Sequence, residues 1–169
     1  KDNTVSVAIN TTTPGATQSS FASKKIVASN LSRISLVVAD INGDGLGDLV
    51  VATNTGSVAV LLNQSPVGSM SPVFSASLPI SVGNASNIVV SDINGDGLPD
   101  ISGLAYDFSS SYLNLSPYVL LNTTAPGAQS ASFAAAENFQ LAGPPCGSAS
   151  INAVDLNGDG SVDLLVTES

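Results

Sequence analysis

The sequence predicts an all-β fold built from repeated units of four antiparallel strands. The first observation is composition: 43% of the residues are hydrophobic and only 10% are charged, with no Trp, no His and few helix-forming Lys, Glu or Arg. The second is a nine-residue pattern that occurs three times, and the third is the short, β-branched apolar segments that flank each copy. At 169 residues, we expect residues 1–169 to form one domain.

The nine-residue pattern supplies oxygen ligands. Its central copy, residues 92–100, reads Asp-Ile-Asn-Gly-Asp-Gly-Leu-Pro-Asp, and the other copies are 40–48 and 155–163. Each copy has carboxylates at positions one, five and nine, an amide at three and a glycine at six, where the backbone must turn sharply. A flexible loop with these groups suits Ca²⁺, which takes six to eight oxygens. We expect one Ca²⁺ per loop, three per chain, held by the side chains of positions one, three, five and nine and the carbonyl of seven: Asp40, Asn42, Asp44, Leu46 and Asp48; Asp92, Asn94, Asp96, Leu98 and Asp100; Asp155, Asn157, Asp159, Ser161 and Asp163.

Two other interpretations explain part of the pattern. The EF-hand loop shares the glycine at position six, but it needs an acidic residue at position twelve, where this chain has Val51, Gly103 and Val166. It also needs flanking helices, whereas the flanks here read as strands. Asn-Gly and Asp-Gly favour metal-free hairpin turns as well. A turn alone, however, does not require three carboxylates in every loop.

The stretches DINGDGLGDLVV, DINGDGLPDI and DLNGDGSVDLLV resemble the FG-GAP or VCBS type repeat of integrin α-chain β-propellers and of many secreted proteins. The resemblance implies that each loop links the first two strands of a propeller blade and holds calcium. The Phe-Gly and Gly-Ala-Pro elements are poorly kept, so the VCBS-like form is the more similar of the two.

Further landmarks repeat with the loops. Asn10, Asn63 and Asn122 each end a strand-like run, and each is followed eleven residues later by a phenylalanine, at positions 21, 74 and 133. The loops recur after 52 and 63 residues, and repeats of that length indicate a propeller or a similar array. The repeats run approximately over 28–80, 81–141, and 142–169 completed by 1–27.

The strands follow from the repeat. In the first unit we expect strands at 34–39, 48–53, 57–62 and 74–80. In the second we expect them at 86–91, 100–105, 117–122 and 133–141. The third unit is divided between the termini, with two strands at 149–154 and 163–167 and the other two at 4–10 and 21–27.

Three blades do not close a propeller, since rings typically need four to eight. Either the chain is a fragment of a longer propeller, or two copies form a six-bladed ring with two-fold symmetry. We expect the homodimer, because the two ends of the chain supply the halves of one blade.

The net charge and the few basic residues argue against nucleic acid as a partner. The net charge is −9, and nine of the thirteen acidic residues lie in the three loops, where three Ca²⁺ would offset six charges. Four basic residues make no patch for nucleic acid.

No apolar run approaches the roughly eighteen residues of a membrane helix, so no membrane insertion is expected. The composition indicates a secreted or cell-surface protein, and the single Cys146 has no His to activate it.

A longer connection in the second unit is the candidate ligand surface. Asp100 and Asn122 are 22 residues apart, against 15 for the equivalent pair in the first unit. The extra residues bring Tyr106, Asp107, Phe108 and Tyr112 to the face opposite the calcium loops, where a glycan or a protein could bind. Alternatively, this is a longer hairpin whose aromatic residues pack on the neighbouring blade.

Two function classes remain open. The first is a non-catalytic calcium-binding module, as in relatives that resemble lectins and integrin heads. The alternative is an accessory or catalytic propeller of a carbohydrate-active enzyme such as a lyase. The absence of His and the commitment of nine carboxylates to metal favour the first, and no catalytic residue is predicted.

Overall fold

The computed structural model describes residues 3–31, 33–53, 55–76, 78–107, 114–141 and 149–168. Over these residues the chain forms twelve strands, all paired antiparallel, and no helix. None of the described segments is therefore a helix able to cross a membrane. The all-β class expected from composition and strand pattern is confirmed.

The first complete sheet contains β3 (Arg33–Ala39), β4 (Asp48–Thr53), β5 (Ser57–Leu61) and β6 (Leu78–Ser81), side by side in chain order. The whole of β4 is buried because it lies centrally and both faces of the sheet are covered. A strand buried on both faces loses the alternation of polar and apolar residues, which explains the continuous apolar run in β4.

The second complete sheet repeats this order with β7 (Asn84–Ser91), β8 (Asp100–Asp107), β9 (Asn114–Leu120) and β10 (Glu137–Asn138). The outer strands are shorter than the sequence pattern indicated, since β6 and β10 have four and two residues.

In both outer segments, the expected strand begins at a phenylalanine that forms only an isolated bridge. Phe74 pairs with Asn63, and Phe133 pairs with Asn122. An edge strand has one neighbour, so less of it is held in a regular ladder.

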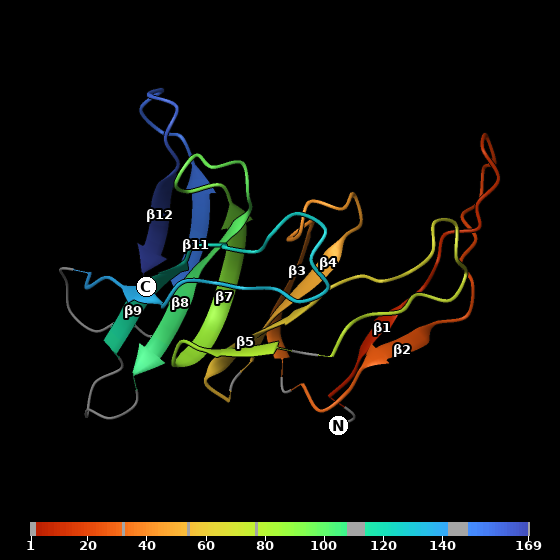
Figure 1. Ribbon diagram of the computed structural model, residues 1–169, viewed down its shortest axis with the longest axis horizontal. Helices are drawn as coiled ribbons and strands as arrows, with labels where there is room; N and C mark the ends of the chain where they lie inside the picture. Colours follow the sequence, from red (N-terminus) through yellow and green to blue (C-terminus); the bar gives the residue numbers. More distant parts are fainter. Residues whose placement is uncertain are drawn as a thin grey trace.

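Two hairpins flank the complete sheets. One consists of β1 (Val5–Val7) and β2 (Lys25–Ala28), and the other of β11 (Ala149–Val154) and β12 (Asp163–Glu168). They are separate two-stranded sheets at opposite ends of the molecule (Figure 1). Each two-stranded sheet therefore leaves the outer edge of both its strands unpaired within the described residues.

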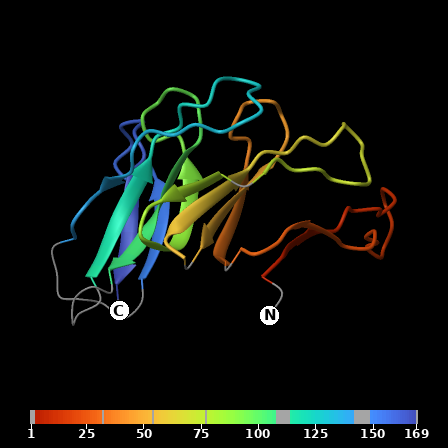
Figure 2. The same ribbon diagram turned by 60° about the horizontal axis from the view of Figure 1, so that its bottom comes forward.

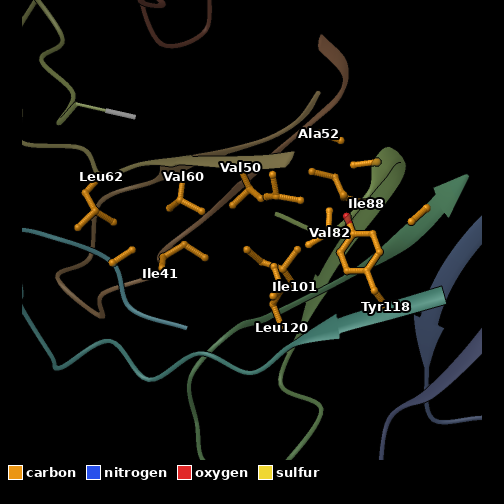
Figure 3. Close-up of a cluster of buried hydrophobic side chains, with 14 residues drawn as sticks. Ile41, Val50, Ala52, Val60, Leu62, Val82, Ile88, Ile101, Tyr118 and Leu120 are labelled. Carbon is orange, nitrogen blue, oxygen red and sulfur yellow. The ribbon is translucent and has the colours of Figure 1, made fainter. Parts of the chain in front are cut away.

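Apolar layers hold the four sheets in a stack. The largest lies between the two complete sheets (Figure 3). It brings Ile41, Val50 and Val60 of the first sheet onto Ile88 and Ile101 of the second. Fully burying each such side chain contributes about 1.5–3 kcal/mol, so this layer is the principal stabilising contact between the sheets.

Two smaller layers fasten the hairpins. On the outer side of the first sheet, Val5 of the β1–β2 hairpin packs on Leu49 and Val51. On the outer side of the second sheet, Leu104 packs with Ile151 of the β11–β12 hairpin. The order of the stack is therefore β1–β2, first sheet, second sheet and β11–β12.

Tyr118 is the largest fully buried side chain of the central layer. Its hydroxyl has no hydrogen-bond partner within the described residues, and burial raises the pKa of Tyr118. The ring fits because Gly103 stands opposite it across β8 and β9. A Cβ at residue 103 would collide with the Tyr118 hydroxyl and would lie 2.9 Å from the Asn87 carbonyl oxygen.

Gly103→Ala is therefore expected to lower the free energy of unfolding by about 2 kcal/mol, because the added methyl overpacks the layer. Urea denaturation measures the change. The matched control is Ser102→Ala in the same strand, which removes a buried hydroxyl without a partner and should cost less than about 1 kcal/mol. Equal losses in the two variants would contradict the close fit of Tyr118 over Gly103.

Candidate metal centres

The three acidic loops lie on the same side of the stack, where the strands that they join end (Figure 2). Residues 40–48 join β3 to β4, residues 92–100 join β7 to β8, and residues 155–163 join β11 to β12. The repeat in the sequence thus becomes a row of three similar loops.

Each loop folds over the carboxylate at its first position. Asp40 accepts the backbone N–H of Asp44 at 3.0 Å and that of Gly45 at 2.8 Å. The equivalent glycines donate to Asp92 at 2.8 Å and to Asp155 at 2.9 Å. These glycines have φ of 85° to 88°, a backbone conformation that favours glycine, which explains their place at position six.

The oxygens of positions one, three and five gather inside the loop. In the first loop, the N–H of Asp44 reaches both the Asp40 carboxylate at 3.0 Å and the Asn42 amide oxygen at 3.2 Å. In the second, the N–H of Asp96 does the same with Asp92 and Asn94, at 3.1 and 3.0 Å. Two side-chain oxygens that share one donor must lie close to each other.

The side chain at position five completes this group. Its carboxylate accepts from the amide nitrogen of position three at 3.0, 2.9 and 3.0 Å in the three loops. It also accepts the N–H of position seven at 2.8 Å in each.

The carboxylate at position nine has a different environment. Asp48 accepts the N–H of Ile41 at 2.8 Å and the N–H of Asn63 at 2.6 Å, and it is fully buried. Asp100 repeats both bonds, with Ile93 at 2.8 Å and Asn122 at 2.7 Å. Each buried carboxylate therefore ties its own loop to the end of the third strand of the sheet.

The electrostatics of these carboxylates differ by position. Burial raises the pKa of Asp48, the Asp44 and Asp40 carboxylates raise it further, and the backbone bonds from Asn63 and Ile41 oppose them. In the third loop, the backbone N–H of Gly160 is the main group that lowers the pKa of Asp155. The N–H of Ser161 does the same for Asp159. Like charges concentrated in this way favour a bound cation.

Residues 40–101 match the model of a protein family, the FG-GAP-like repeat. The matched stretch is less than half of the chain. It contains the first two loops and the strands between them, which confirms the resemblance found in the sequence. The comparisons with curated proteins and with solved structures gave no match.

The donor set of the three loops fits calcium in its chemistry. As the side chains stand, no group of three or more His, Cys, Asp or Glu among the described residues is arranged to hold a metal ion. Their oxygens accept loop N–H groups instead. A carboxylate oxygen has more than one lone pair, so it can keep an N–H and also bind a cation. Carboxylates, an amide oxygen and a backbone carbonyl are the ligands that Ca²⁺ takes.

The first loop is covered by the second sheet, a feature that the sequence analysis did not predict. The side chain of Asn42 donates to the carbonyl of Ala128 at 2.9 Å. The backbone carbonyl of Asn42 accepts the N–H of Gly127 at 2.7 Å. The side chain of Asn122 donates to the carbonyl of Ile41 at 2.8 Å. The one signal in the sequence is Pro126-Gly127, a turn-forming pair that lies far from the loop along the chain.

The expected ligand surface is described only in part. Tyr106 is partly buried and packs against the layer between the second sheet and the β11–β12 hairpin. Asp107 ends β8, while Phe108 and Tyr112 lie outside the described residues. Binding at this surface stays a prediction.

The position-nine carboxylate should be structural even without metal. In chelator, Asp100→Ala is expected to lower the free energy of unfolding by about 3 kcal/mol, because two backbone N–H groups lose their acceptor. Asp96→Ala, in the exposed part of the same loop, should cost less than about 1 kcal/mol. Chemical denaturation measures both, and a larger loss for Asp96→Ala would contradict this assignment.

Proposed function

We propose that this chain is a calcium-binding β-propeller module without catalytic activity, part of a secreted or cell-surface protein. The observation that carries the proposal is the row of three loops on one side of the stack, each with three carboxylates and each with the same hydrogen bond from its position-six glycine to its first aspartate. The match of residues 40–101 to the FG-GAP-like repeat supports it.

The propeller assignment rests on the arrangement of the sheets. Each complete sheet has four strands in chain order and packs face to face on the next sheet through an apolar layer. Successive blades of a propeller are related in this way. On this assignment the β1–β2 and β11–β12 hairpins are the outer and inner halves of a further blade.

Calcium would act on the loops by neutralising like charges. The carboxylates of positions one and five would bind the ion with the amide oxygen of position three and the carbonyl of position seven. The position-nine carboxylate would contribute a further oxygen from the buried side of the loop, while it keeps its hydrogen bonds to the backbone N–H groups. A ligand that binds only the folded chain stabilises it in proportion to the logarithm of its concentration above Kd.

The proposal of a non-catalytic module follows from the available side chains. The sequence has no His and four basic residues, and only four acidic residues lie outside the loops. A paired acid and base is therefore hard to assemble. We propose that the face opposite the loops binds a glycan or a protein, with the connection between β8 and β9 as part of that surface.

Titration calorimetry with Ca²⁺ should show three sites per chain, and Ca²⁺ should raise Tm. Asp96→Ala should remove one site and a share of the increase in Tm, because the fifth-position carboxylate is lost. Lys24→Ala, a change at an exposed residue outside the loops, should leave both values unchanged. Absence of binding heat together with an unchanged Tm would contradict the proposal.

A further inference from the structure

We propose that the two ends of the stack are complementary and that a second copy of this chain docks there, completing the divided blade. The trailing face is the outer side of the β11–β12 hairpin, with Leu156 and Leu165. The leading face is the outer side of β3 in the first sheet, with Leu36 and Val38. The proposal rests on the blade assignment above but does not require calcium.

The trailing face repeats residues that are buried inside the chain. Counted from the first aspartate of each loop, Leu156 and Leu165 stand at the positions of Ile41 and Val50. Ile41 and Val50 are both 0% exposed, because the second sheet covers them. Leu156 is 62% exposed and Leu165 43%. The trailing face is thus an interface without its covering sheet.

The leading face repeats the other side of the same layer. Leu36 and Val38 precede the first loop by the same numbers of residues as Ile88 and Val90 precede the second. Ile88 is 5% exposed in the central layer and Val90 packs beside it. Leu36 and Val38 are 43% and 60% exposed. The leading face therefore presents apolar side chains at the positions from which the second sheet covers Ile41 and Val50.

A groove marks the place that the trailing face would fill. Its volume is about 350 Å³, and its lining includes Val38, Leu49 and Phe74 of the first sheet and Val7 and Ile9 of the N-terminal segment. In the complete interface, the equivalent space beside Val90 receives side chains of the preceding sheet.

Hydrogen-bonding groups at the two ends also complement each other. In both complete sheets, the position-nine carboxylate accepts the N–H of the asparagine two residues after the third strand. Asp163 accepts only from Leu156, at 3.0 Å, so one of its oxygens has no partner within the described residues. Asn10 has the local geometry of the other two asparagines: it bridges Phe21, and its side-chain oxygen accepts the N–H of Thr12 at 2.9 Å. The Asn10 N–H is thus the missing donor.

The repeat fixes the strand register of the docked pair. In the first sheet, Leu49 lies opposite Leu61. Leu49 is one residue after the position-nine aspartate, and Leu61 is two residues before the asparagine that donates to that aspartate. The second sheet keeps this offset. Transferred to β12 and a second copy's β1, it places Leu165 opposite Val7 and Val166 opposite Ser6.

The faces agree with this register. Val166 packs on the second sheet, so the residue before it, Leu165, points to the outer side. Within the N-terminal hairpin, Val5 packs on the first sheet, and Val7 shares its face. Leu165 and Val7 would therefore both cover the first sheet of the second copy. Two copies docked at both ends close six blades around a two-fold axis.

Light scattering on the calcium-loaded chain at micromolar concentration is expected to give twice the chain mass of 16.8 kDa. Leu156→Asp should raise the dissociation constant about tenfold or more, because it places a charge in the interface. Leu78→Asp changes an exposed apolar side chain, 42% exposed, beside Val60 and Gln129 and away from both end faces, and it should leave association unchanged. A stable, folded monomer of the unmodified chain would overturn the proposal.

Cysteine cross-linking tests the register, in a background carrying Cys146→Ser. Val7→Cys with Leu165→Cys should give disulfide-linked dimers, whereas Ser6→Cys with Leu165→Cys places the thiols on opposite faces and should not. Equal cross-linking of the two pairs, or of neither, overturns the proposed pairing. A monomer that binds three Ca²⁺ would refute docking alone, and a cross-linked dimer without Ca²⁺ binding would refute the calcium module alone.

Discussion

A buried carboxylate that accepts backbone N–H groups from two segments is the interaction on which this structure depends. Asp48 and Asp100 each fix the second residue of their loop and the asparagine two residues after the third strand. Desolvation of such a group is costly, and it raises the pKa of Asp48. Two charge-assisted hydrogen bonds offset that cost. Loop conformation and the position of the third strand are thereby set by one side chain per sheet.

The stacking of sheets follows from the same constraint. Once the third strand is in place, β4 and β5 are apolar on both faces, and each face needs a covering layer. Within the chain, two complete sheets cover each other, and one hairpin covers each outer side. The β1–β2 hairpin is half as wide as a full sheet, which is why Val38 stays exposed. Leu156 stays exposed because no described segment covers the outer side of the β11–β12 hairpin. The proposed calcium sites and the proposed docking faces therefore both arise from one repeat.

Much of this architecture could be predicted from the sequence, because it depends on local patterns. The acidic loops and the strands around them follow from spacing and β-branched runs. The division of one unit between the two ends of the chain stays a prediction. The double role of Asp48 could not be predicted, since its partner Asn63 is 15 residues away. The cover over Asn42 comes from Ala128, 86 residues away, and no local pattern encodes it. The outer strands were predicted too long because pairing at an edge depends on neighbours, not on propensity.

Amide hydrogen exchange at Asn122 tests the central claim most directly. If the Asp100 carboxylate holds this N–H, as the 2.7 Å bond indicates, the amide should exchange as slowly as the amides of the buried strand β8. In Asp100→Ala, exchange at Asn122 should accelerate by roughly 30-fold or more relative to β8, since about 2 kcal/mol of local protection is lost. Exchange at the rate of an open loop in the unmodified chain, or a rate unaffected by Asp100→Ala, would contradict the account.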